Sequence, residues 1–243
     1  MATKLSININ KIALLRNSRG RNFPDVAAFA TRCLQLGAHG ITLHPRPDQR
    51  HARYDDVAPL KEICAANRRE LNIEGYPSPD FLNVVKQARP AQCTLVPDDP
   101  AQLTSDHGWD IAKEAQRLRR IIDELHGEDI RVSLFVDYDN PDIRLAKELG
   151  ADRIELYTEP YAQSFGSDAN GAILTGFRNA TRQATEVGLG VNAGHDLSLQ
   201  NLAGFVAVPN ILEVSIGHAF VVECIDAGIE AVMKQYLEIL GTA

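Results

Sequence analysis

The sequence lacks the features that mark membrane, exported and nucleic-acid-binding proteins. No stretch of its 243 residues approaches the roughly 18 consecutive apolar residues that a membrane span requires. No basic segment followed by an apolar core and a small-residue cleavage site opens the chain, so nothing in it directs export. A net charge of −7 argues against a broad basic face for nucleic acid or a membrane surface. Any anionic ligand therefore has to bind at a local site.

Cysteine is scarce, and its spacing points to neither disulfides nor metal binding. The four cysteines lie far apart, with no CxxC pair and no histidine at zinc-finger spacing: Cys33, Cys64, Cys93 and Cys224. We expect them to be reduced residues in or near the core, which favours a cytoplasmic protein. The length is near the roughly 250 residues of one β/α barrel. We therefore expect a single catalytic domain over residues 1–243.

Short aliphatic or β-branched runs alternate with longer amphipathic segments, which predicts a parallel sheet. The expected strands are Leu5–Ile9, Gly40–His44, Glu70–Glu74, Gln92–Val96, Arg131–Val136, Arg153–Leu156, Gly190–Asn192 and Leu212–Ile216. Helical patterns lie near residues 25–36, 55–66, 79–88, 110–126, 141–148, 169–187, 198–207 and 219–240. Eight such units predict an α/β fold of the (β/α)₈ TIM-barrel type. A doubly wound open sheet is the alternative, weakened by the missing GxGxxG after the first strand.

Polar residues stand where the predicted strands end, and in a β/α barrel these positions converge on one mouth. The mouth positions are Asn8, Asn10, Lys11, His44, Arg46, Glu74, Asp98, Thr104, Asp137, Glu155, Tyr157, Asn192, His195, Gly217 and His218. A purely structural barrel has no reason to gather three histidines and a glutamate at one rim. Histidine titrates near neutrality, and a glutamate in a partly dry mouth has its pKa raised toward the same range. The set predicts general acid–base chemistry.

Several features predict that the ligand carries phosphate. His44 and Arg46 are two apart on an extended segment, so a proton-transfer group and an anion clamp face the same way. Gly194 and the pair Gly217–His218 follow the seventh and eighth strands, where many barrels bind a phosphate through backbone N–H groups. Two basic loops flank the mouth, RNSRGRN at 16–22 and HPRPDQRHARY at 44–54.

At these residues the chain resembles the pyridoxine 5′-phosphate synthases of the deoxyxylulose-dependent vitamin B6 pathway. Seven ordered blocks carry the resemblance: NINKIALLRNSRG at 8–20, GITLHPRPDQRH at 40–51, LNIEGYPS at 71–78, LVPDDP at 95–100, IELYTEPYA at 154–162, VNAGHDLSL at 191–199 and EVSIGHA at 213–219. The resemblance implies a β/α barrel that condenses 1-deoxy-D-xylulose 5-phosphate with 3-amino-2-oxopropyl phosphate. The implied products are pyridoxine 5′-phosphate, inorganic phosphate and water, and no metal or organic cofactor is implied.

The resemblance also implies residue roles. His44 and Glu74 would accept protons, His195 would donate one, and Glu155 would stabilise charged intermediates. The substrate contacts it implies are Asn8, Arg19, Arg46, His51, Thr104, Asp196, Gly217 and His218. Members of the family usually form homo-octamers, in which part of the first loop contributes to a neighbour's site.

The chain departs from the best-known form of this family at four positions. That form has Asp and His where this chain has Asn10 and Lys11, and Gly at the positions of Glu159 and Asp196. The proposed catalytic residues are intact, so the NINK, NIEGYPS and HDLSL segments resemble those of a second branch of the family. The departures bear on the substrate contacts at positions 10, 11 and 196.

Other functions known for β/α barrels that bind small phosphorylated ketones remain as alternatives for this chain. A metal-dependent lyase or hydrolase would use His44, Glu74, His195 and His218 as ligands, but the usual HxH after the first strand is missing. A Schiff-base aldolase would need Lys11 desolvated inside the barrel. A non-catalytic phosphometabolite sensor would have no need for the intact acid–base set.

Overall fold

The computed structural model describes residues 2–98 and 105–242 and contains a closed barrel of eight parallel strands. The strands are β1 Lys4–Asn8, β2 Gly40–Leu43, β3 Glu70–Gly75, β4 Gln92–Leu95, β5 Arg131–Val136, β6 Arg153–Tyr157, β7 Gly190–Gly194 and β8 Ile211–Ile216. Each strand pairs with the next in sequence, and β1 pairs with β8 to close the ring. The predicted (β/α)₈ barrel is confirmed, and the open-sheet alternative is wrong because an open sheet leaves two unpaired edges.

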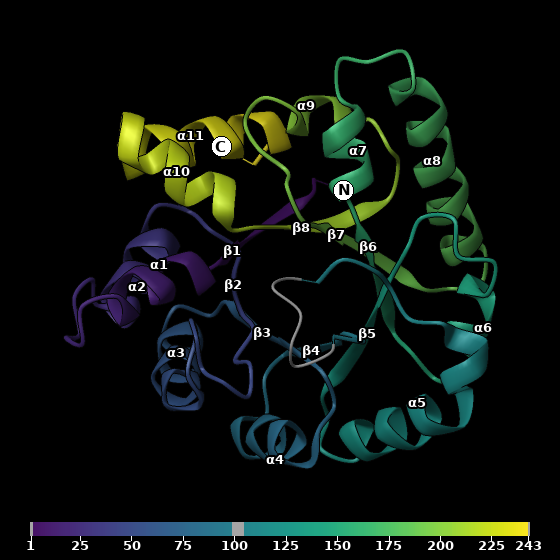
Figure 1. Cartoon of the computed structure of the whole chain (residues 1–243), viewed down its shortest axis with the longest axis horizontal. Coiled ribbons are helices and arrows are strands. Elements are labelled where there is room, and N and C mark those ends of the chain that lie inside the picture. The colour runs from purple at the N-terminus through teal and green to yellow at the C-terminus, as the bar shows by residue number, and fades with distance from the viewer. Residues whose placement is uncertain (1, 99–104, 243) are drawn as a thin grey trace.

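Helices surround the ring of strands, as Figure 1 shows. They are α1 Asn10–Asn17, α2 Val26–Gln35, α3 Val57–Ala66, α4 Pro79–Ala88, α5 Ile111–His126, α6 Ile143–Glu148, α7 Glu159–Ser164, α8 Asn170–Glu186, α9 Leu202–Phe205, α10 His218–Ala227 and α11 Ile229–Leu240, with a short 3₁₀ turn at Tyr54–Asp56. Side-chain caps fix several starts: Asp25 accepts from the N–H of Ala28, and Ser78 accepts from the N–H of Phe81. The apolar core fills the layer between these helices and the barrel.

Four details of the predicted helices differ from the structure. The segment after the first strand, expected as a loop, begins with helix α1, and the unpredicted α7 follows β6. The pattern over 198–207 contains only the short α9. The pattern over 219–240 is two helices, because Gly228 adopts φ 81° and interrupts the helix there. These differences lie after β1, β6, β7 and β8, where the chain also forms the mouth of the barrel.

The inside of the barrel is polar, in contrast to the branched aliphatic filling that barrels commonly have. Ser6 and Thr42 hydrogen-bond through their hydroxyls at 2.7 Å, and the Nδ2 of Asn72 lies 3.5 Å from the Thr42 hydroxyl. Thr94 in turn donates to Asn72 Oδ1 at 3.0 Å. These buried side chains form a continuous hydrogen-bonded layer that supports the residues at the mouth.

Candidate active site

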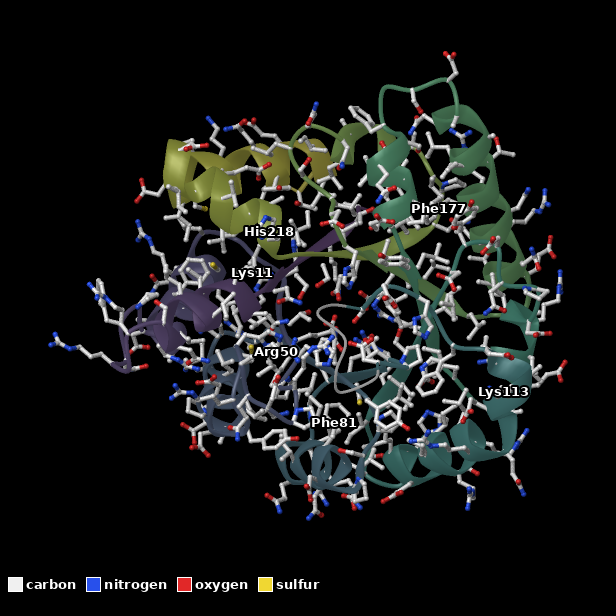
Figure 2. All side chains as sticks on the ribbon, viewed as in Figure 1. Lys11, Arg50, Phe81, Lys113, Phe177 and His218 are labelled. Atoms are coloured by element: carbon white, nitrogen blue, oxygen red, sulfur yellow. The ribbon has the colours of Figure 1, made fainter. Side chains whose placement is uncertain are left out.

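A cavity of about 680 Å³ opens at the carboxyl ends of the strands. Ten of the twelve predicted site residues line it, namely Asn8, His44, Arg46, His51, Glu74, Glu155, His195, Asp196, Gly217 and His218. Figure 2 shows Lys11, Arg50 and His218 nearer the middle of the ring than Lys113, which lies on its periphery. Thr104 lies outside the described residues. Arg19 is exposed in the turn after α1 and does not line this cavity.

Glu74 lies near the end of β3, where two amide donors approach its buried carboxyl. The Nδ2 atoms of Asn8 and Asn72 lie 3.4 Å from its Oε2 and Oε1 respectively. Burial raises the pKa of Glu74 well above its usual range, and the charge of Glu155 acts in the same direction. The side chain therefore holds a proton more tightly than an exposed glutamate does.

Glu155 lies on β6, where its carboxyl packs against the backbone of β7. Thr94 Oγ1 donates to its Oε2 at 3.4 Å, and a Cβ built on Gly194 would lie 2.5 Å from its Oε1. Burial raises the pKa of Glu155 to about 8, and the nearby carboxylate of Glu213 adds to the effect. Near neutral pH this group exchanges its proton readily, which suits proton transfer.

We expect Glu155→Gln to stabilise the protein increasingly as the pH rises. The folded-state pKa of about 8 exceeds the ordinary 4.5, so the native state binds this proton more tightly than the unfolded chain does. The wild type therefore loses stability as the pH rises from about 4.5 through about 8, and glutamine abolishes that loss. Thermal unfolding of both proteins at about pH 5, 7 and 8.5 measures the difference. A constant difference in melting temperature would contradict the raised pKa.

The two central histidines are held as neutral imidazoles. His44 is buried, and its backbone N–H donates to Asn10 Oδ1 at 2.9 Å. Burial lowers the pKa of His44 well below 6.5, with Arg46 adding to the shift. Burial also lowers the pKa of His195 to about 4, and its ring lies between those of Phe135 and Tyr157 at 5.4 and 5.2 Å. The cavity thus combines neutral imidazoles, which accept protons, with carboxyls that hold them.

The segment that carries His195 adopts an unusual backbone. His195 and Asp196 have φ of 85° and 55°, a left-handed conformation that is uncommon outside glycine. The Thr158 hydroxyl lies within hydrogen-bond distance of the carbonyls of Gly194, at 2.6 Å, and of His195, and its one proton is shared between them. Asn201 Nδ2 donates to the carbonyl of Asp196 at 2.9 Å. Strained backbone held by its surroundings is common at functional sites. Sequence reasoning missed Thr158 and Asn201, because no local pattern marks their contacts.

Arg46 forms a buried ion pair with Asp98 beside the cavity. Both side chains are less than 5% exposed, and Ser105 Oγ donates to Asp98 Oδ2 at 2.8 Å. This contact holds the guanidinium in one orientation beside the cavity, so its positive charge can meet an anion there without further ordering.

We expect Arg46→Lys to weaken binding of a phosphorylated substrate by about tenfold or more. Lysine keeps the charge but loses the planar fork that binds Asp98 and a phosphate oxygen together. Isothermal titration of inorganic phosphate and of the sugar phosphate into both proteins measures the effect. Arg144→Lys is the matched control, because Arg144 forms an exposed ion pair with Glu186 on the outer helices. Equal affinities for wild type and Arg46→Lys would assign Arg46 a structural role alone.

Arg16, another arginine of the basic loops, has different surroundings from Arg46. Arg16 is buried on α1 and binds Asp56 through two contacts of 2.5 and 2.9 Å, so it is a structural residue. The adjacent Asn17 donates through Nδ2 to the carbonyls of Gln49, Arg50 and His51. The end of α1 thereby fixes the loop that carries Arg50 and His51 into the cavity.

The four positions that depart from the best-known form of the family all line the cavity: Asn10, Lys11, Glu159 and Asp196. Asn10 uses its side chain to hold the backbone of His44, and Gln163 donates to Glu159. Lys11 is exposed at the mouth, without the desolvation that a Schiff-base lysine requires. The helix α10 begins at His218, so its N-terminal N–H groups face the cavity next to Gly217.

Neither a metal-binding cluster nor a membrane-spanning helix is present in the part of the chain that the structure describes. Over residues 2–98 and 105–242, no three His, Cys, Asp or Glu side chains stand close enough to hold a metal ion together. Such a group is therefore not formed by the four residues of the alternative metal site, His44, Glu74, His195 and His218. Within the same ranges, no helix is long and apolar enough to cross a membrane.

A β/α barrel with ionisable side chains gathered at the carboxyl ends of its strands defines the class of barrel enzymes. Residues 5–242 match the family model described as "Pyridoxal phosphate biosynthesis protein PdxJ". This chain belongs to that family.

Curated relatives are similar over nearly the whole chain. The protein named "Pyridoxine 5'-phosphate synthase" from Xanthomonas axonopodis pv. citri (strain 306) is 51% identical over 248 residues, covering 99% of this chain and 97% of the relative. A protein of the same name from Xylella fastidiosa (strain M12) is 50% identical, covering 99% of this chain and 95% of the relative.

Solved structures of low identity share the fold alone. Thiamine phosphate pyrophosphorylase from Pyrococcus furiosus superposes with a TM-score of 0.64 at 13% identity, covering 98% of this chain and 95% of that one. N-(5'-phosphoribosyl)anthranilate isomerase from the same organism superposes with a TM-score of 0.61 at 10% identity, covering 99% of this chain and 100% of that one.

Proposed function

We propose that the chain is a pyridoxine 5′-phosphate synthase. It condenses 1-deoxy-D-xylulose 5-phosphate with 3-amino-2-oxopropyl phosphate and releases pyridoxine 5′-phosphate, inorganic phosphate and water. The observation that carries this proposal is the convergence of two neutral histidines and two proton-holding carboxyls in one cavity beside Arg46 and the N-terminus of α10. The family and the names of the relatives support the same reaction.

The reaction is a series of proton transfers without a redox step. An amine joins a ketone, a ring closes, water leaves and phosphate is expelled, so several acid–base groups around one cavity suffice. His44 and Glu74 act as proton acceptors in this proposal, and Glu155 stabilises positive charge on the intermediates. Glu74 ionises when the substrate ammonium enters, because an opposite charge nearby favours the carboxylate.

His195 donates a proton to the leaving oxygen. Its pKa of about 4 leaves it neutral near pH 7 in this structure. Phosphate dianions entering the cavity raise that pKa, since they favour the charged imidazolium. The backbone N–H groups of Gly217 and His218 bind one phosphate, while Asn8, Arg46, His51 and Asp196 contact the substrates. Thr104 is proposed as a further substrate contact.

The direct test mixes chelator-treated protein with both phosphorylated substrates and follows pyridoxine 5′-phosphate and released phosphate together. Equal formation of both, independent of added metal, supports the synthase assignment. A folded protein that forms neither product would contradict it and favour a diverged barrel enzyme acting on a related phosphorylated ketone.

We also propose that residues 1–243 form a single catalytic domain that assembles as a homo-octamer in the cytoplasm. Exposed apolar side chains on neighbouring surfaces support association: Leu14 and Leu15 on α1, Phe23 after it, and Val222 and Ile225 on α10. Arg19 lies beside this surface and not at its own cavity. A neighbouring copy docked there would receive Arg19 into its site, as the family resemblance implies.

We expect a mixture of Arg19→Ala and His44→Ala proteins to regain activity that neither has alone. A complete site needs His44 from one chain and Arg19 from its neighbour, so random assembly restores about one quarter of the sites. The mixture is dissociated, reassembled and assayed at substrate concentrations below KM. Arg21→Ala mixed with His44→Ala is the matched control for a general effect of mixing. Absence of complementation in a fully reassembled mixture would place Arg19 outside the neighbour's site.

A further inference from the structure

Two buried side chains below the cavity bridge the carboxyls of Glu74 and Glu155. Asn72 Nδ2 lies 3.4 Å from Glu74 Oε1, and its Oδ1 accepts a 3.0 Å hydrogen bond from Thr94 Oγ1. Thr94 Oγ1 also lies 3.4 Å from Glu155 Oε2. Thr94 is fully buried and Asn72 is 5% exposed, and neither lines the cavity. They therefore act on substrate only through the two carboxyls.

The hydroxyl of Thr94 has one proton for two acceptors. It points either to Asn72 Oδ1 or to Glu155 Oε2, while Gln92 Nε2 donates to the hydroxyl oxygen at 3.3 Å. When Glu155 is ionised, the hydroxyl turns to it. When Glu155 is protonated, its own O–H donates to Thr94, and the Thr94 proton turns to Asn72.

Asn72 couples the orientation of the Thr94 hydroxyl to Glu74 without itself gaining or losing a proton. Its oxygen faces Thr94 and its NH₂ group faces Glu74, so a hydrogen bond received at the oxygen polarises the amide and strengthens its donation to Glu74. A protonated Glu155 thus favours an ionised Glu74. This arrangement suits a pair in which one carboxyl accepts a proton while the other keeps one.

We propose that Thr94 and Asn72 are positioning residues that link the protonation of Glu155 to that of Glu74, so that the cavity presents one acid and one base at a time. The consequence for turnover rests on the proposed function, whereas the link between the two carboxyls does not.

Other titratable groups lie around Glu155 on the neighbouring elements. Glu213 approaches from β8, Glu74 from β3 and His195 from the end of β7. Arg153 and Arg131 lie further toward the opposite end of the barrel, where Arg153 binds Asn192 and Arg131 binds Gln92 and Glu70. Within the described residues, Thr94 is the one side chain that donates a hydrogen bond to Glu155. Its hydroxyl is therefore the group to remove.

The test compares Thr94→Val, which removes the hydroxyl at nearly constant volume, with Thr94→Ser, which keeps it. Carboxyl carbons are observed by ¹³C NMR in glutamate-labelled protein, with Glu155→Gln and Glu74→Gln used to assign the signals. In Thr94→Val we expect the pKa of Glu155 to rise by about one unit, because a donor to the ionised form is lost. The link is read from the response of Glu74 to the group at position 155. Glu155→Gln, which fixes a neutral donor there, is expected to lower the pKa of Glu74, and to lower it less in the Thr94→Val background, because Asn72 no longer relays the change. Thr94→Ser is expected to titrate as the wild type does.

A smaller response of the Glu74 pKa to Glu155→Gln in the Thr94→Val background is the signature of the link, since the direct repulsion between the two carboxylates does not pass through Thr94 and acts in both backgrounds. An equal response in the folded Thr94→Val and wild-type backgrounds, or an unchanged pKa of Glu155 in Thr94→Val, would overturn the proposal. If Thr94→Val does not fold, Thr94→Ala removes the same hydroxyl and leaves room for adjustment. The pH profile of kcat adds a second readout, with the basic limb of Thr94→Val displaced upward, because Glu155 then keeps its proton to higher pH. If the wild type forms no product, the proposed function fails, and the titrations still decide this inference.

Discussion

Glu74→Gln and His44→Ala are each expected to lower kcat by about 10²–10⁴-fold while the barrel stays folded. A positioned acid–base group contributes rate enhancement of that order. Glutamine keeps the shape of Glu74 and one acceptor oxygen, so the packing changes little and one of the two contacts from Asn8 and Asn72 is retained. His44 contributes its backbone N–H, not its ring, to the contact with Asn10, and alanine preserves that contact.

Steady-state rates with both substrates, together with melting temperatures, separate catalysis from folding. Glu148→Gln and His126→Ala are the matched controls, because both residues lie on outer helices away from the cavity. Both controls should retain the wild-type kcat. Full turnover in Glu74→Gln or in His44→Ala would remove that residue from the acid–base set, and a large loss of melting temperature would make its role structural.

The sequence alone predicted the strands well because each strand leaves a local signal. Their bounds agree with the structure to within two residues, since the runs of buried aliphatic residues end where the polar mouth begins. Knowledge of barrel geometry then placed the residues at the strand ends around a single cavity, which explains how His44, Glu74, Glu155 and His195 were found together.

The parts that the sequence did not predict depend on contacts between distant segments. The pattern of Ile12, Ala13 and Arg16 fits a helix, but the glycine and arginines after it favoured a loop. Arg16 was grouped with anion-binding arginines, and only the fold brings it to Asp56. The contacts of Thr158 with the backbone at the end of β7 and just after it join residues 36 and 37 apart in sequence. No periodicity within one segment encodes such contacts.

The interior bridge through Asn72 and Thr94 illustrates a related limit. Alternation along β3 and β4 identifies both residues as facing the barrel interior, where apolar side chains are more common. Their significance depends on which atoms meet across strands, such as the approach of Thr94 to Glu155 over 61 positions of sequence. Site chemistry was thus predictable from strand ends, whereas the groups that support it required the folded chain.

Gly194→Ala is expected to leave the protein folded and to reduce kcat by about 100-fold or more. The new Cβ would lie 2.5 Å from Glu155 Oε1, while its distances to Ser215 are 3.5 Å and cause no conflict. The carboxyl must therefore move away from the position that it needs for catalysis, and a small misplacement of a catalytic group is costly. Gly171→Ala on α8 is the matched control, because nothing lies within 4 Å of its added Cβ.

A double-mutant cycle decides whether the displaced carboxyl explains the loss of activity. Aspartate at position 155 is one methylene shorter and leaves room for the methyl group at 194, so the two changes should not be additive. We expect Glu155→Asp to cost a smaller factor in kcat in the Gly194→Ala background than in the wild type. Equal factors in both backgrounds would mean that Gly194 is required for the backbone of His195 and not for the placement of Glu155.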